Sequence, residues 1–174
     1  MTILGFDLGH RGTVEAEHWL TSLVESPVPG LVACTHFAHG PAPRVLVTIA
    51  GVDPGSVPSG GEAATPEAVA DRAAAVAAAV ADHRAGRAGR AVLFAGVRSL
   101  TGTMPVATLL AVSAIDEVVV LGGPPPGPDT LIDTRDFVRP QYRDGRLVLM
   151  ATPAPGGLIA PFEVPNPTPC CANH

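Results

Sequence analysis

The chain has 174 residues, of which 47% are apolar and 16% charged, so it carries enough apolar material for one folded domain with its own core. All 11 basic residues are arginines, which excludes mechanisms that need a lysine amine, such as Schiff-base formation or a Walker-type phosphate lysine. A formal charge of -5 and few aromatic residues (five Phe, one Trp, one Tyr) speak against a nucleic-acid-binding surface.

The compartment follows from what the sequence lacks. Residues 1–7 show no basic stretch and no long apolar run of the kind that marks an export signal, and the apolar run 105–115 is too short to cross a bilayer. We therefore expect a cytoplasmic protein with no membrane partner. In a reducing compartment, three cysteines favour free thiols or metal ligation over a disulfide framework.

The first half of the chain predicts strands and helices in alternation. Residues 2–8 have the pattern of a buried strand, and Thr13 is a suitable N-cap for a helix over 14–25. Two β-rich runs, 31–37 and 44–50, are separated by a spacer too short for a crossover, which predicts an antiparallel pair. A threonine cap followed by Pro66 predicts a helix from there to residue 85.

The second half predicts a parallel unit and a closing hairpin. A buried strand over 91–97, a helix over 103–114 and a strand over 117–121 follow in the order of a right-handed crossover. The runs 147–151 and 158–164 have the pattern of a hairpin. We expect an α/β fold with a mixed, mostly parallel sheet flanked by helices and extended by antiparallel hairpins. Residues 1–164 form its single domain, and residues 165–174 form a proline-rich C-terminal arm.

Six of the nine cysteines and histidines fall in two short segments, which makes them candidate metal ligands: Cys34, His36, His39, Cys170, Cys171 and His174. Positions 34 and 36 are two apart on a predicted strand, so their side chains leave the same sheet face, and position 39 follows at the strand end. Thiolate and imidazole ligands favour zinc, with copper(I) as the alternative. Each residue also has a structural interpretation, as a buried thiol, a hydrogen-bonded loop histidine or part of a tail without metal.

Catalytic candidates lie at the end of the first predicted strand. If the first two strands run parallel, Asp7 and His10 reach the same sheet edge as His39. A metal ion there would activate water for hydrolysis, with Asp7, Glu15 or Glu17 as the base. The alternative roles are a turn residue for Asp7 and first-turn helix carboxylates for the two glutamates.

An anion-binding candidate lies in the turn from Gly96 to Pro105, between a predicted strand and a predicted helix. Free backbone N–H groups there, together with the side chains of the turn, can hold a phosphate or carboxylate. The residues concerned are Arg98, Thr101, Gly102 and Thr103. An ordinary strand-to-helix turn with a threonine cap is the alternative.

These patterns leave three functions open. The first is a small protein that binds a transition metal, zinc in the leading interpretation, with metal-dependent hydrolysis as its chemistry if it is an enzyme. The second is a non-catalytic binding or assembly module, with a structural metal or none, that docks on a partner or on a second copy of itself. The third is an enzyme or sensor for a small anionic ligand held at the 96–105 turn.

Overall fold

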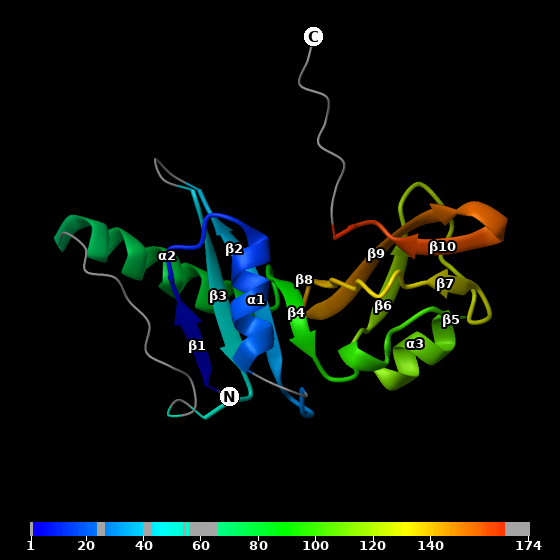
Figure 1. The fold of residues 1–174 in the computed structure, drawn as a ribbon, viewed down its shortest axis with the longest axis horizontal. Helices are drawn as coiled ribbons and strands as arrows, with labels where there is room; N and C mark the ends of the chain where they lie inside the picture. Colours follow the sequence, from blue (N-terminus) through cyan, green and yellow to red (C-terminus); the bar gives the residue numbers. More distant parts are fainter. Residues whose placement is uncertain (1, 24–26, 40–42, 54, 56–65, 166–174) are drawn as a thin grey trace, which may run out of the picture.

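The structure is a computed structural model that describes residues 2–23, 27–39, 43–53, 55 and 66–165. This part of the chain forms three α-helices, all within the first two thirds of the sequence, and ten strands (Figure 1). Their bounds are β1 Ile3–Phe6, α1 Thr13–Leu23, β2 Val32–Ala38, β3 Arg44–Ala50, α2 Pro66–Ala85, β4 Arg90–Phe94, β5 Thr103–Pro105, α3 Val106–Val112, β6 Glu117–Val120, β7 Leu131–Asp133, β8 Gln141–Arg143, β9 Arg146–Ala154 and β10 Leu158–Pro161.

The ten strands form one mixed sheet in the order β1-β3-β2-β4-β8-β9-β10-β7-β5, with β6 beside β9. The prediction of a mostly parallel sheet is wrong, because only the β6–β9 and β10–β7 pairs are parallel and every other pair is antiparallel. Short connections account for the hairpins β2–β3, β8–β9 and β9–β10, since strands joined by a few residues pair as antiparallel neighbours. In the N-terminal half each helix crossover passes over one strand, so β1 and β2 become antiparallel neighbours of β3 and β4, respectively. Both predicted hairpins, β2–β3 and β9–β10, are confirmed.

The prediction that the strands 91–97 and 117–121 form a parallel pair is also wrong. Strand β4 pairs with β2 and β8, whereas β6 pairs with β9, so the two strands are not neighbours. The connection between them does not run directly into a helix. It first forms a short 3-10 helix, Val97–Ser99, and then β5, which pairs with β7 at the far edge of the sheet; the seven-residue α-helix α3 follows these.

The N-terminal half is a three-layer unit with one helix on each face of the β1-β3-β2-β4 sheet (Figure 1). Strands β1 and β2 run parallel with β3 between them, and β3 and β4 run parallel with β2 between them. The crossovers β1–α1–β2 and β3–α2–β4 run in the same direction across the sheet. They start from β1 and β3, which are antiparallel. Right-handed connections then place α1 and α2 on opposite faces.

Packing on the two faces reflects the side chains available. Helix α1 contributes Leu20 to a buried cluster with Val45 and Val47 of β3. On the other face α2 packs closely on β1, where a Cβ at Gly5 would lie within 2.7 Å of Val76 and Val80. A glycine in the strand therefore allows the alanine- and valine-rich helix to approach.

The C-terminal half joins the N-terminal half at β4 and β8, and its core extends to Cys34 of β2 and to Ala91 and Phe94 of β4. Its buried cluster includes Leu109 of α3, Ile132 of β7 and Leu149 of β9. The β4–β8 pairing consists of the register pair Arg90–Gln141 and backbone hydrogen bonds on either side of it. In the part of the chain described here, no helix combines the length and apolar character needed to span a membrane.

Candidate functional site

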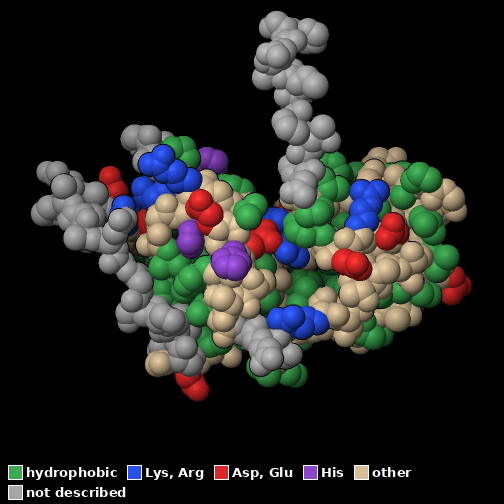
Figure 2. Space-filling model, viewed as in Figure 1, with side chains coloured by type: hydrophobic (Ala, Val, Ile, Leu, Met, Phe, Trp, Pro, Cys, Tyr) green, Lys and Arg blue, Asp and Glu red, His purple; other side chains and the backbone are tan. Residues whose placement is uncertain are grey.

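A cleft of about 1370 Å³ lies at the junction of the two halves. It is lined by the start of α1, the end of β2, one face of α2, the segment 87–90 that enters β4, strand β8, and residues 162–165. In the space-filling view, acidic and basic side chains meet at this junction (Figure 2). The cleft is the place where segments far apart in the sequence bring polar side chains together.

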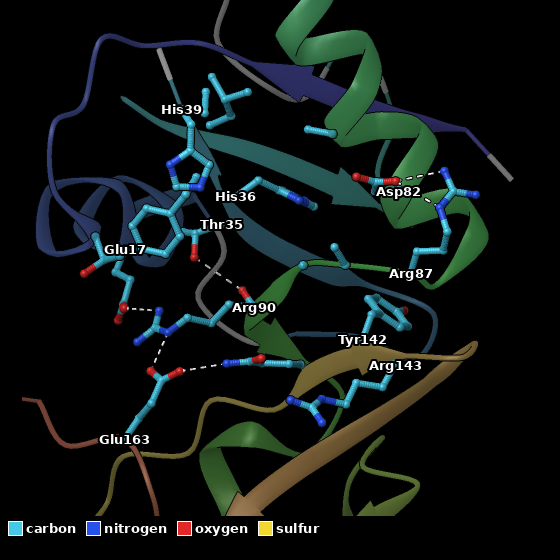
Figure 3. Close-up of a pocket in the computed structure, with 18 of the residues that line it drawn as sticks. Glu17, Thr35, His36, His39, Asp82, Arg87, Arg90, Tyr142, Arg143 and Glu163 are labelled. Carbon is cyan, nitrogen blue, oxygen red and sulfur yellow. Dashed lines mark hydrogen bonds and ion pairs between the residues drawn. The ribbon is translucent and has the colours of Figure 1, made fainter. Parts of the chain in front are cut away.

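Glu17, Arg90 and Glu163 form one side of the cleft (Figure 3), and Arg139, just outside the lining, completes a network of two glutamates and two arginines. Glu17 of α1 accepts hydrogen bonds from Arg90 at 2.5 Å and from Arg139 at 2.6 Å and 3.0 Å. Arg90 also donates to Glu163 at 2.5 Å, and Gln141 donates to the other oxygen of Glu163 at 3.1 Å. The network therefore connects the first helix to strands β4 and β8 and to the last described segment.

This network is nearly buried, so its charges depend on each other. The side chains of Arg90, Arg139 and Glu17 are 11%, 13% and 14% exposed. Burial opposes ionisation of Glu17, but hydrogen bonds and positive charge from Arg139 and Arg90 outweigh it and lower the pKa of its carboxyl. The guanidinium of Arg139 also lies 4.1 Å from the ring centroid of Phe137, a cation–π geometry.

A buried hydrogen-bonded chain lies behind the cleft, between β2, β3 and α2. Thr48 Oγ1 lies 2.8 Å from Nε2 of His36 and 2.7 Å from Nδ1 of His83. The hydroxyl has one proton, so it donates to one imidazole and accepts from the other. The ring of His83 also packs against Tyr142, with centroids 5.3 Å apart. His36 and Tyr142 line the cleft. The hydrogen bond to Thr48 fixes the orientation of the His36 ring.

These groups are uncharged near neutral pH. Burial lowers the pKa of His36 to about 4, although the charge of Asp82 acts in the opposite direction. Burial and the neighbouring His36 lower the pKa of His83 to about 4 as well. Burial, with smaller contributions from Cys34 and Asp116, raises the pKa of Tyr142 to about 12. The cleft thus presents two neutral hydrogen-bonding side chains beside its ion pairs.

The prediction of a transition-metal protein is contradicted by the described residues, which contain no group of three or more His, Cys, Asp or Glu placed to hold a metal ion. Cys34 and His36 do leave the same face of β2, since both lie beside Gly89. That face is the core under α2, where Cys34 is fully buried and burial raises the pKa of its thiol well above the ordinary value. The thiolate that a metal needs is disfavoured there.

The other predicted ligands are separated from this pair or cannot be placed. The ring of His36 is hydrogen-bonded to Thr48, while His39 is exposed at the cleft. Cys170, Cys171 and His174 lie outside the described residues, as does the predicted arm apart from Pro165.

The predicted catalytic pair lies away from the cleft. Asp7 follows β1 and forms ion pairs with Arg44 at 2.8 Å and with Arg72 at 3.9 Å. His10 lies 3.8 Å from Glu15. The carboxylate of Asp7 is therefore held by guanidinium groups of the chain itself.

The predicted anion-binding turn already contains a carboxylate from the chain. The backbone N–H of Gly102 donates to Asp136 at 2.8 Å. Thr103 belongs to strand β5, so it does not cap the following helix, which begins at Val106. Arg98 lies in a short 3-10 turn, and Thr101 is exposed.

Sequence patterns missed most of the residues that meet at the cleft. Thr48 is a polar residue in the otherwise apolar run of β3, and His83 lies in the last turn of α2, which are the only local signals of a buried polar contact. The partners of Glu17 are 73 and 122 residues away, so no spacing rule connects them. Comparison with known protein families, curated protein sequences and solved structures gives no match.

Proposed function

We propose that the cleft binds an organic ligand that has an apolar body and one anionic group. This site is not the 96–105 turn. Of the predicted metal ligands that the structure describes, it includes His36 and His39 but not Cys34. The observation that carries the proposal is Arg143, which lines the cleft and has no acidic partner among the described residues.

The apolar part of the proposal rests on exposed side chains at the cleft. Val14, Phe37 and Phe162 are 74%, 61% and 60% exposed, the three largest values among the exposed large hydrophobic residues, and all three line the cleft. Exposed apolar residues that gather around one cavity are typical of a binding site. The alanines of α2 extend this apolar lining.

The ionic part follows from counting charges in the cleft. The cleft is lined by three acidic residues, Glu17, Asp82 and Glu163, and by three arginines, Arg87, Arg90 and Arg143. Arg139, which lies just outside the lining, adds a second guanidinium to Glu17. With Arg139 included, the charged side chains described at the cleft sum to one positive charge, and Arg143 is the arginine among them that forms no ion pair.

A separate ion pair on α2 does not change this balance. Arg87 is balanced by Asp82 at 2.8 Å, which leaves Arg143 as the cleft arginine able to receive an external anion without breaking an internal pair. A planar guanidinium suits a carboxylate or phosphate group. The neutral side chains of His36 and Tyr142 can add hydrogen bonds that carry no charge.

The test uses octanoate as the probe and compares two arginines that face each other across the β8–β9 hairpin. Arg143 lines the cleft, whereas Arg146 pairs with Glu117 outside it. We expect octanoate to perturb backbone amide signals around the cleft and the Arg143→Gln variant to bind it about 5–10-fold more weakly. Arg146→Gln should bind as the wild type does, and octanol should bind more weakly than octanoate.

Two results would overturn the proposal. One is octanoate binding that is equal in Arg143→Gln and the wild type. The other is a set of perturbed amides that lies away from the cleft.

A further inference from the structure

Strand β2 extends beyond its pairing with β4, and the unpaired part borders the cleft. Strand β2 pairs with β3 at all seven positions, from Val32 to Ala38. On its other side the pairing with β4 ends at Thr35, opposite Arg90. Residues 36–38 therefore have a neighbouring strand on one side only among the described residues, and all three line the cleft.

The end of this pairing has a local cause at Gly89. Its φ of 134° is one that residues with a side chain rarely adopt, and a Cβ there would lie 3.0 Å from the ring of His36 and 3.2 Å from the sulfur of Cys34. The chain entering β4 thus passes over these two side chains and not beside the backbone of β2. The carbonyl of Gly89 accepts a hydrogen bond from the backbone N–H of Tyr142, so on its other side this segment pairs with β8.

An unpaired stretch of strand offers backbone hydrogen-bonding groups. Along a strand, the N–H and C=O of successive residues point alternately to the two sides, so three residues present at least one such pair toward the open side. Edges of this kind accept an added strand from another chain. Here the edge faces a cleft of about 1370 Å³ and not a covering helix or loop of the described chain.

We propose that the ligand of the cleft is an extended peptide segment of a partner protein, which adds a strand to β2 beside His36, Phe37 and Ala38. This inference rests on the proposed function and names its ligand class. Only a peptide supplies alternating N–H and C=O groups for the edge, an apolar side chain for Phe37, and a carboxylate for Arg143. The preferred sequence has alternating apolar residues and one Asp or Glu.

The position of Arg143 and the alternation of side chains along a strand define how the peptide lies. Ala33 of β2 packs in one cluster with Leu20 of α1, and Phe37, four positions further along the strand, leaves the same face. Every second side chain of the added strand therefore lies on the face that α1 covers. The intervening side chains lie on the face of His36. Among the described residues of the cleft, Arg143 is the one arginine without an ion pair, so a second acidic residue in the peptide would have no partner there.

The experiment selects binders from a displayed library of random 12-residue peptides, using the wild-type protein as bait, and measures their affinity as synthetic peptides. We expect bound peptide to slow amide hydrogen exchange at residues 36–38. Methylation of one backbone nitrogen in the peptide should weaken binding at least tenfold, whereas methylation of the adjacent nitrogen should have a smaller effect. The exposed substitution Phe37→Glu should abolish peptide binding, and the equally polar change Val112→Glu on α3, outside the cleft, should preserve it.

The outcomes separate this inference from the proposed function. If octanoate binds through Arg143 but selection yields no peptide with a Kd below 100 µM, or if selected peptides leave the exchange of residues 36–38 unchanged, the peptide inference is overturned and the proposed function stands. A dimer seen in sedimentation that Phe37→Glu dissociates would show that a second copy of the chain occupies the edge, and it would also overturn the inference. If neither probe requires Arg143, both proposals fail.

Discussion

Replacement of Glu17 by glutamine tests the ion network at the junction. The substitution removes the negative charge and replaces one of the two carboxylate oxygens with an NH2 group, so either Arg90 or Arg139 loses its acceptor at residue 17. Arg90 keeps Glu163, and Arg139 keeps the carbonyl of Val138. Removing one partner of a buried pair costs about 3–5 kcal/mol of folding free energy. Because Glu17 is 14% exposed and Arg90 keeps a second partner, we expect the lower end, about 3 kcal/mol.

The assay is urea unfolding followed by fluorescence of Trp19, the chain's single tryptophan, which packs against Phe6. With a slope of about 2 kcal/mol per molar urea, a loss of about 3 kcal/mol lowers the midpoint by about 1.5 M. The matched control is Glu117→Gln, which breaks an ion pair whose side chains are 38% and 59% exposed. It should cost no more than about 1 kcal/mol.

The pH dependence supplies an independent check on the same substitution. The pKa of Glu17 is lowered from its ordinary value of 4.5 by its two arginines, so its contribution is complete above that value and is lost as the pH falls further. The difference between wild type and Glu17→Gln should therefore shrink in acid. A midpoint shift no larger than that of the control at pH 7 would refute the assignment of a stabilising, buried network.

Three further predictions concern the buried chain and the turns. Thr48→Val removes the hydroxyl between His36 and His83, leaves two buried ring nitrogens without a partner, and should lower unfolding free energy by about 2–3 kcal/mol in urea titrations; an effect below 0.5 kcal/mol would contradict the hydrogen-bonded chain. The pKa values of both histidines are lowered to about 4 from 6.5, so as the pH falls the unfolded chain binds protons before the folded protein does. The free energy of unfolding should therefore decrease between pH 6.5 and about 4, by up to about 1.4 kcal/mol per pH unit for each histidine, and these groups should have no effect above that range. Thermal unfolding as a function of pH measures this. Gly96→Ala would place a Cβ 1.9 Å from a backbone oxygen at the end of α3, whereas Gly122→Ala meets nothing within 4 Å, so the first should lower the melting temperature far more although both have positive φ.

Local patterns in the sequence predicted most elements because their causes are local. A proline in the first helical position and a glycine after residue 85 define α2, and the spacer before Arg44 defines the β2–β3 hairpin. Strands β5, β7 and β8 were missed because each has three residues, too few to show a period.

Pairing between distant strands was beyond these patterns. The order strand, helix, strand around α3 predicted a parallel pair, but β5 intervenes and β6 pairs with β9, about thirty residues further on. Which strands become neighbours depends on the apolar surfaces that the whole chain must bury, and a single crossover does not contain that information.

The candidate site shows the same division between local and distant causes. The strand period placed Cys34 and His36 on one face correctly, yet it could not show that α2 buries that face and that Thr48 occupies the imidazole. A cluster along the sequence predicts a shared volume, whereas ligation also requires exposure and further donors in space.

The ion network implies a constraint on how this protein can diverge. Four side chains from four separate stretches of the chain neutralise one another at the junction, with Glu17 and Glu163 on one side of the balance and Arg90 and Arg139 on the other. A change of charge at any one of them leaves an uncompensated ion in a largely buried position. Substitutions at these four positions should therefore be correlated. In an alignment of relatives, covariation among these four positions would trace the contact between the two halves from sequence alone.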